Sequence, residues 1–363
     1  MRIAKIQIKN FKSHEYYLQE IEDKFNHIVI YGDNGVGKTN ILECFSYFSN
    51  SSGLRGDRLE KLIPLQKKKE LVDTNIFLKV YSGNHHINLI FTINKIGEDL
   101  KKNLYLYEKK SSLLNIKSYI SFIWLTPYMD KIMYEGQSIK RNFIDKMITQ
   151  NDKTFNQILI SYKKDIAERL AILKNSKDDK WLNIIEKKLA EFIFNIFQIR
   201  RQYVQKLNKI IHEKLSNFKK VELRYKNNFF SNLEKKQEVI DHFEKKFKLN
   251  RQIDEISKKT NFGINSDEII FFDKKNEINS ESCSTGEQKS SLLTIILANC
   301  WKLKSEEKDF ILLLDEATSH IDENNFEKLF KEVSKFETQI WYTGTSKKLF
   351  QVIENKGFFI HLQ

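Results

Sequence analysis

The stretch from Tyr31 to Asn40, YGDNGVGKTN, places three of the chain's 12 glycines directly before a lysine and a threonine. Glycine lets backbone amides approach a ligand closely, and the candidate ligand is phosphate. The preceding HIVIY is expected to be a strand and the following NILECFSYFS an amphipathic helix, which completes the arrangement of a phosphate-binding loop. Lys38 would reach the terminal phosphates and Thr39 would ligate Mg²⁺. A glycine-rich turn that matches by chance is the competing interpretation, and the flanking elements disfavour it.

Two adjacent acids, Asp315 and Glu316, end the apolar run FILLLDE. Alone, such a pair is often only the polar end of a buried strand. Beside a phosphate-binding loop it acquires a chemical role. Asp315 would hold the metal through water, while Glu316 would polarise the water that attacks the terminal phosphate.

A third motif, STGEQ from Ser284 to Gln288, opens an expected helix. A Ser or Thr cap followed by an acid in the first turn is ordinary helix chemistry, and that interpretation stays open. The order of the motifs along the chain favours a different interpretation of STGEQ. The order of segments along the chain resembles that in ATP-binding cassette ATPases. It is the phosphate loop, the helical segment, STGEQ, LLLDE and then SHID at Ser319–Asp322. In that superfamily the signature helix of one subunit binds the terminal phosphate that another subunit holds.

The elements that must position these motifs come from both ends of the chain. Alternating or apolar runs predict strands at 2–9, 27–31, 74–81, 86–94, 120–125, 268–272, 310–314, 339–343 and 357–362. Residues 138–259 show helical periods instead, and strands alternating with helices predict a mostly parallel sheet covered by helices. We therefore expect an α/β fold of two domains. They are a discontinuous ATPase head with a mixed sheet, at 1–125 and 265–363, and an inserted, mainly helical lid or arm at 126–264.

Composition indicates a soluble globular protein, with 40% hydrophobic and 30% charged residues among 363. No apolar run reaches the roughly 18 residues that a membrane helix needs. Cys44, Cys283 and Cys300 are an odd number without metal-ligand spacing, which favours a reducing compartment, and we expect a cytoplasmic protein without a membrane partner. The net charge of +13 suits a polyanion such as DNA, but a lysine-rich composition explains it equally well. If the charge is functional, we expect a DNA-binding face to which basic pairs of the helical insert contribute, with the pair at 140 and 141 as a further candidate. The pairs of the insert are Lys163 and Lys164, Arg200 and Arg201, and Lys245 and Lys246.

Three further segments resemble the RecF family of bacterial recombination mediators, which is related to the ATPase heads of chromosome-maintenance proteins. They are IQIKNFKSHE near the start, the stretch Leu125–Met147 with its Thr-Pro, Gly and basic pair, and IWYTGTS near the end. The chain departs from the family pattern at Gly263–Glu268, GINSDE, where a Pro-His-Arg run is usual. The basic pair is reduced to Lys140 and Arg141, and Thr345 stands where cassette ATPases carry a switch histidine, so hydrolysis should be slow.

The resemblance implies a weak, DNA-stimulated ATPase of recombinational repair with ATP and Mg²⁺ as cofactors. It further implies an ATP-dependent homodimer that clamps double-stranded or gapped DNA and works with RecR and RecO. Two alternatives remain, an ATPase subunit that energises a transport protein and a nucleotide-gated binding module that hydrolyses almost no ATP. The implied catalytic residues are Glu316 and Lys38, and the implied metal ligands are Thr39 and Asp315. The implied nucleotide-binding residues are Lys12, Gly32, Asp33, Asn34, Gly35, Val36, Gly37, Lys38, Thr39, Asn40, Ser284, Thr285, Gly286, Glu287, Gln288, Asp322 and Thr345.

Overall fold

The chain forms two units, and each is described by itself. The computed structural model describes residues 1–49, 53–64, 73–83, 85–96, 99–150, 152–175, 178–227, 235–316 and 323–363. The head unit consists of Met1–Asp130 and Asn299–Gln363, and the helical unit is Lys131–Ala298. Residues 265–298, which the sequence assigns to the head, thus belong by their contacts to the helical unit. The predicted domain boundaries remain a proposal.

The head unit contains a five-stranded parallel sheet with strand order β14-β3-β13-β12-β8. Segments from both parts of the chain pair in it, as the sequence predicts. The carboxyl ends of its strands therefore meet at one edge, which is where ligands bind in open parallel sheets. Its strands are β3 (His27–Tyr31), β8 (Phe122–Leu125), β12 (Ile311–Leu314), β13 (Ile340–Gly344) and β14 (Gly357–His361).

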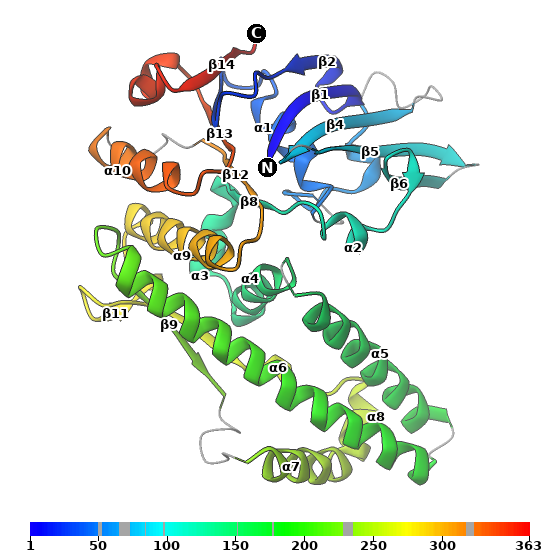
Figure 1. Ribbon diagram of the computed structural model, residues 1–363. Coiled ribbons are helices and arrows are strands. Elements are labelled where there is room, and N and C mark those ends of the chain that lie inside the picture. Colours follow the sequence, from blue (N-terminus) through cyan, green and yellow to red (C-terminus); the bar gives the residue numbers. More distant parts are fainter. Residues whose placement is uncertain are drawn as a thin grey trace. The chain divides into compact units, whose positions relative to one another are not determined.

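A second, six-stranded sheet in the head unit is antiparallel, with strand order β2-β1-β4-β5-β6-β7 (Figure 1). The predicted hairpin of β4 and β5 is present, but β2 and β6 escape sequence analysis. Each of their sequences, HEYYLQE and DLKKNLYL, buries only one side chain, so the apolar alternation that marks a strand is weak. The strands are β1 (Arg2–Phe11), β2 (His14–Glu20), β4 (Thr74–Ser82), β5 (His85–Ile96), β6 (Asp99–Leu106) and β7 (Lys109–Lys110).

Helix α1 (Lys38–Ser46) is part of a core that includes inward side chains of both sheets. Phe45 packs on Phe122 and Trp341 of the parallel sheet, while Tyr47, just after the helix, contacts Phe91 of the antiparallel sheet. Helix α10 (Glu323–Ser334) packs against the parallel sheet through Phe330, whose ring centroid lies 4.7 Å from that of His27. A helix held by packing on several sides gives its N-terminal loop a rigid base.

The helical unit is built mainly of the long helices that the sequence predicts, but it also contains a three-stranded antiparallel sheet with order β11-β10-β9. Strand β9 corrects the expectation of a continuous helical pattern. Its sequence VELRYK alternates and buries Val221 and Leu223, which is a strand period. The elements are α3 (Lys131–Tyr134), α4 (Gln137–Thr149), α5 (Lys153–Asn175), α6 (Asp179–Lys214), β9 (Val221–Lys226), α7 (Lys236–Leu249), α8 (Arg251–Ser257), β10 (Glu268–Asp273) and β11 (Ile278–Asn279).

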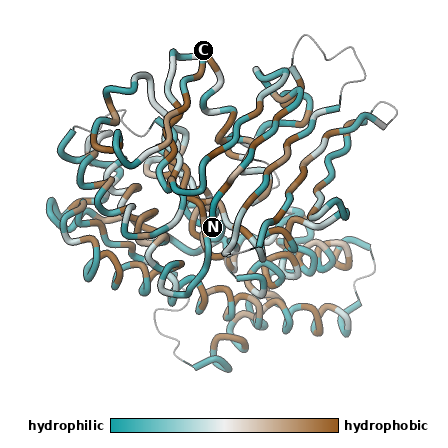
Figure 2. The backbone as a smooth tube through the Cα atoms, turned by 45° about the horizontal axis from the view of Figure 1, so that its top comes forward, coloured by the Kyte–Doolittle hydropathy of each residue, from teal (hydrophilic) through white to brown (hydrophobic). Residues whose placement is uncertain are grey.

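Helix α9 (Thr285–Ser305) starts in the helical unit and ends in the head unit. In Figure 2 the helices alternate between hydrophobic and hydrophilic residues along their length, as expected for helices that bury one face. Within the described residues, no helix is long and apolar enough to cross a membrane.

A buried charge cluster joins α5, α6 and α8. Arg169 has no exposed surface and donates to Glu186 at 2.9 Å and to Asp254 at 2.7 Å. It also donates to the carbonyl of Phe247 at 3.0 Å. Each acid is itself buried, so removing the guanidinium would leave carboxylates without compensation in a medium of low dielectric constant.

We expect Arg169→Ala to destabilise the helical unit by about 3–5 kcal/mol, because it removes one partner from a buried ionic cluster. Urea unfolding followed by circular dichroism measures this loss. Lys209→Ala is the matched control, since Lys209 forms an exposed pair with Glu213 on α6 and should cost less than about 1 kcal/mol. Equal effects of the two substitutions would show that the cluster does not stabilise the unit.

Candidate nucleotide-binding site

The loop between β3 and α1 requires glycine at two positions for steric reasons. A Cβ on Gly32 would lie 2.1 Å from the carbonyl oxygen of Leu362, and Gly32 has φ +152°. Gly37 has φ +99°, and a Cβ there would lie 2.5 Å from Ser13 Oγ and 2.6 Å from His14 Nε2. The spacing of glycines therefore reflects close packing around the loop as well as access to its amides.

Lys38 is 8% exposed, and its ammonium group is held by the loop that precedes it. Nζ donates to the carbonyls of Gly32 at 2.7 Å and Asp33 at 2.6 Å. Burial lowers the pKa of Lys38, while the carboxylates of Glu316 and Asp315 oppose that change. The side chain is thus curled over the loop, in position to exchange carbonyl oxygens for those of a phosphate.

Three side chains from separate segments meet at the carboxyl edge of the parallel sheet. Thr39 Oγ1 donates to Asp315 Oδ1 at 2.9 Å, and Thr343 Oγ1 donates to the same oxygen at 2.7 Å. Asp315 is 5% exposed, and its burial raises its pKa, although both hydroxyl donors favour the charged form. Residues 276 positions apart in sequence therefore form one small cluster of oxygens.

This cluster fits a Mg²⁺ ion. Mg²⁺ takes hard oxygen ligands and is usually held by one or two protein groups, with phosphates and water completing its octahedron. Thr39 and Asp315 supply such a pair. No group of three or more His, Cys, Asp and Glu side chains suited to a metal occurs in the described part of the chain, so phosphate and water would have to provide the other ligands.

Glu316 follows Asp315 in the left-handed region, with φ +50°. Its backbone amide donates to Thr343 Oγ1 at 2.7 Å, which fixes the turn. The backbone conformation therefore sends successive acids to different places, with Asp315 buried at the loop and Glu316 exposed in the pocket. Strain of this kind costs about 1–3 kcal/mol and is characteristic of functional sites.

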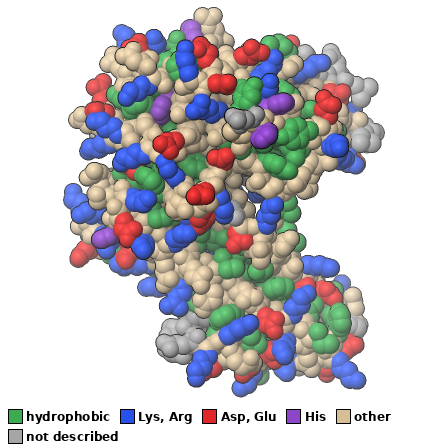
Figure 3. All heavy atoms as spheres, in the orientation of Figure 1, with side chains coloured by type: hydrophobic (Ala, Val, Ile, Leu, Met, Phe, Trp, Pro, Cys, Tyr) green, Lys and Arg blue, Asp and Glu red, His purple; other side chains and the backbone are tan. Residues whose placement is uncertain are grey.

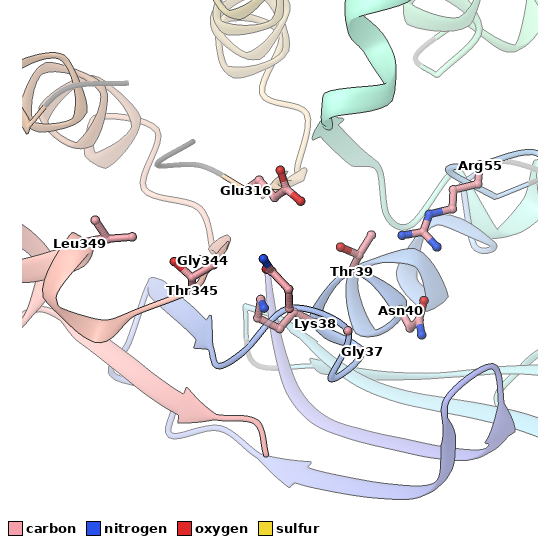
Figure 4. A pocket seen from close by; sticks show the side chains of 11 residues that line it. Gly37, Lys38, Thr39, Asn40, Arg55, Glu316, Gly344, Thr345 and Leu349 are labelled. Carbon is pink, nitrogen blue, oxygen red and sulfur yellow. The ribbon is translucent and has the colours of Figure 1, made fainter. Parts of the chain in front are cut away.

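A pocket of about 640 Å³ lies over the loop, and every residue that lines it belongs to the head unit. Its size is in the range of small-molecule and cofactor sites. Figure 4 shows the Lys38 amine facing Glu316, with the Arg55 guanidinium on the side of Thr39. The pocket is lined by Asn34, Gly35, Gly37, Lys38, Thr39, Asn40, Arg55, Glu316, Gly344, Thr345 and Leu349.

Arg55, Gly344 and Leu349 line the pocket but were missed by sequence analysis, and Arg55 is the charged one. Its guanidinium lies 5.3 Å from the centre of the Tyr128 ring and 3.7 Å from Glu43. The only available signal was an arginine between glycines in GLRGDR, which by itself is too common to assign. Lys12, which was predicted to bind nucleotide, is not among the lining residues, because its ammonium is paired with Glu43 and Asp57 at 2.6 Å each.

The predicted signature residues Ser284–Gln288 lie in the helical unit, where they form a capping box. Ser284 Oγ donates to Glu287 at 3.0 Å, and its amide donates to the same carboxylate at 3.1 Å. The ammonium of Lys219, 2.8 Å away, and these donors lower the pKa of Glu287 to about 2. The local structure is thus the ordinary helix cap that the sequence left open. Asp322 lies outside the described residues.

Comparison with known proteins decides the family resemblance. No family model matches the chain. The DNA replication and repair protein RecF of Rickettsia felis is 28% identical over 357 residues, which cover 98% of this chain and 95% of that protein. RecF of Rickettsia conorii is 28% identical over 341 residues, which cover 93% of this chain and 92% of that protein. The chain is similar to these RecF proteins over nearly its whole length.

Solved structures of related fold show the same similarity. A structure of the recombination mediator RecF with ATP from the RecFOR pathway superposes with a TM-score of 0.81, at 23% identity over 95% of this chain and 92% of that chain. An Smc head domain from Pyrococcus furiosus has a TM-score of 0.51, at 17% identity over 96% of this chain and 90% of that chain. These matches confirm the predicted α/β fold of the ATP-binding cassette ATPase head.

Some of the cations that sequence analysis named as candidate DNA contacts are buried in the helical unit. Lys140 is 1% exposed and pairs with Glu281, and Arg200 is 2% exposed and pairs with Asp145 and Asp267. Arg141 donates to the carbonyl of Asp267 at 2.7 Å. These side chains hold α4, α6 and the GINSDE segment together. The expectation that Lys140 and Arg200 contribute to a basic surface is therefore wrong, because their charged groups are buried and paired inside the unit. Arg141 is half-buried and stays a candidate. The exposed candidates are Lys163, Lys164, Arg201 and Lys245.

Proposed function

We propose that the chain is an ATP-dependent DNA-binding protein of recombinational repair that hydrolyses ATP slowly. The observation that carries the proposal is the convergence of Lys38, Thr39, Asp315 and Glu316 on one pocket of the parallel sheet. The similarity to RecF over 98% of the chain supports the repair role. Cytoplasmic work on chromosomal DNA follows from that role.

In this proposal each pocket residue has a distinct task. Lys38 releases the carbonyls of Gly32 and Asp33 and donates to the terminal phosphates. Thr39 and Asp315 would hold Mg²⁺, which would supply positive charge against the phosphates. Glu316 accepts a proton from the attacking water. Arg55 adds a second positive charge at the far side of the pocket, where it stabilises negative charge on the phosphates.

Two features of the pocket support slow turnover. Thr345 lines the pocket at the position that the resemblance gives to a switch histidine, and a threonine hydroxyl does not ionise near neutral pH and so cannot relay a proton as histidine does. A hydrogen bond from the hydroxyl of Thr343 holds Asp315, and thus the metal site, in place, and this hydroxyl is not an acid or base at neutral pH. Hydrolysis would then rest on Glu316 alone.

Dimerisation follows from the proposed role of the signature. Ser284, Thr285 and Gly286 at the start of α9 are exposed, and a Cβ on Gly286 would meet no atom within 4 Å. An exposed helix N-terminus suits a phosphate presented by a second copy of the chain. ATP bound at the pocket of one protomer would join it to the signature of the other, and DNA would bind across the closed pair. RecR and RecO would act as partners.

We expect ATP to tighten binding to duplex DNA, and we expect that affinity to fall by about 10³-fold or more between about 50 and 200 mM salt if some six phosphates are engaged. Ser284→Arg should remove the ATP effect by occupying the proposed phosphate position, without weakening ATP binding by the monomer. Fluorescence anisotropy of labelled duplex and sedimentation velocity with ATP or ADP measure both effects.

Ser118→Arg is the matched control, because it adds the same charge at an exposed serine of the head unit. It should keep the ATP-dependent dimer. Equal duplex affinity with ATP, with ADP and with Ser284→Arg would reject the clamp and leave the net charge of +13 as a feature of composition.

A further inference from the structure

Three large aliphatic side chains stand exposed on the helical unit in helical spacing. Leu249 ends α7 and is 81% exposed, while Ile253 and Ile256 of α8 are 57% and 83% exposed. Ile253 and Ile256, three positions apart, lie on one side of α8, and Leu249 ends α7 two residues before α8 begins. Figure 3 shows hydrophobic side chains exposed among Lys and Arg on the surface of the helical unit. Isolated aliphatic residues on a surface are normal, but several large exposed ones close together are a feature of binding faces.

These side chains are not part of an incomplete core, since the opposite faces of α7 and α8 are already packed. Val239, Phe243 and Phe247 are fully buried on α7. On α8, Asp254 is buried against Arg169, and Arg251 donates to Glu186 at 2.6 Å. The rotation of both helices is therefore fixed, and it directs the three aliphatic side chains outward. A face held in this way loses little conformational entropy when a partner binds.

Positive charge surrounds the three side chains. Lys245, Lys248, Lys258 and Lys259 are exposed, and in the described part of the chain none of these four lysines is in an ion pair. Arg251 differs, because Asp179 and Glu186 neutralise it. The acids of α7 and α8 are engaged elsewhere or partly buried. Asp254 pairs with Arg169, Glu238 pairs with Lys235, Asp241 accepts a hydrogen bond from Gln237, and Glu244 and Glu255 are half-buried. The exposed side of this region thus combines an aliphatic stripe with uncompensated lysines.

We propose that this surface, the α7–α8 stripe, binds an acidic segment of another protein that presents apolar side chains in a helical pattern. The stripe consists of Leu249, Ile253 and Ile256 with the four flanking lysines. An apolar helix face gains from burying the aliphatic groups, and carboxylates on its borders meet the lysines. Nucleic acid fits less well, because its backbone offers the lysines phosphates but offers three aliphatic side chains nothing to bury against. The proposal does not depend on the nucleotide pocket.

The test uses a synthetic peptide of about 15 residues with leucines at helical spacing and Glu or Asp at the flanking positions, labelled for fluorescence anisotropy. The full-length protein should bind it more tightly than it binds a scrambled peptide of the same composition. Leu249→Asp combined with Ile256→Asp should weaken binding by about 10-fold or more, since each aliphatic group contributes through burial. Lys248→Glu with Lys258→Glu should also weaken it and should flatten its dependence on salt.

Ile160→Asp is the matched control, because Ile160 is 56% exposed on α5 but lies outside the stripe, and it should leave peptide binding unchanged. Circular dichroism and thermal unfolding verify that all variants fold. Four results would overturn the proposal. They are equal binding of the scrambled peptide, loss of duplex DNA binding in the Leu249/Ile256 variant, loss of binding to phosphatidylglycerol vesicles in that variant, and a concentration-dependent dimer without nucleotide that the variant abolishes. The last three would assign the stripe to DNA, to a lipid surface or to a second copy of the chain.

Discussion

Lys38→Ala should abolish tight ATP binding. Lys38 is the one side-chain cation of a loop otherwise made of backbone amides, and it lies buried at the floor of the pocket. Charge-assisted hydrogen bonds to phosphate contribute about 1.5–3 kcal/mol each, so the loss of two should lower affinity by about 10²-fold or more. Isothermal titration with Mg²⁺ and ATP measures the change.

The fold should survive this substitution, because the ammonium contacts only carbonyls of its own loop. Lys331→Ala is the control, since Lys331 is 70% exposed on α10 and pairs with Glu327. It should bind ATP as the unaltered protein does. Unchanged nucleotide affinity in Lys38→Ala would refute the assignment of the loop.

Glu316→Gln should leave ATP binding intact and reduce hydrolysis by about 10²-fold or more, because it keeps the size of the side chain while removing the base. Glu316 lines the pocket, whereas its neighbour Asp315 is buried against Thr39 and Thr343. Substitutions of the two acids should therefore have different effects. Asp315→Asn should weaken Mg²⁺-dependent ATP binding, which Glu316→Gln should not.

Single-turnover release of phosphate measures hydrolysis without interference from product dissociation. Sedimentation velocity with ATP should show an accumulated dimer for Glu316→Gln, since the nucleotide that joins the protomers persists. Glu323→Gln is the control, because it removes an exposed acid from the first turn of α10. Normal turnover in Glu316→Gln would assign the base to another residue.

Local sequence patterns were sufficient to predict the phosphate loop and most strands. Gly32, Gly37, Lys38 and Thr39 lie within eight positions, so their joint geometry depends mainly on the short chain between β3 and α1. Buried strands such as ILLL at 311–314 are recognisable because apolar runs bounded by charged residues have few other solutions. Strands β2 and β6 were missed because each buries only one side chain, which weakens the alternation. Strand β9 alternates clearly but is short and lies between long helical segments, so it was assigned to the helical pattern.

Charged residues show where the sequence was insufficient. Arg200 and Arg201 are adjacent and chemically identical, yet Arg200 is 2% exposed and bound to Asp145, while Arg201 faces solvent. Lys12 was predicted to bind nucleotide and Arg55 was not, and distant partners decide their positions too. Glu43 and Asp57 engage Lys12, and Arg55 is left to line the pocket. Burial and pairing of this kind depend on partners tens to more than a hundred residues away, which no local pattern contains.

The sequence by itself determined the chemistry of the site, because the residue types of a phosphate loop and of an acidic strand end restrict what they can bind. Only the tertiary structure decided how that chemistry is arranged. The parallel pairing of β3, β13 and β12 brings Thr39 within 2.9 Å of Asp315, and the left-handed turn at Glu316 directs the second acid into the pocket. Strand order results from packing of the whole core, so contacts across 276 residues become defined only when the sheet has formed.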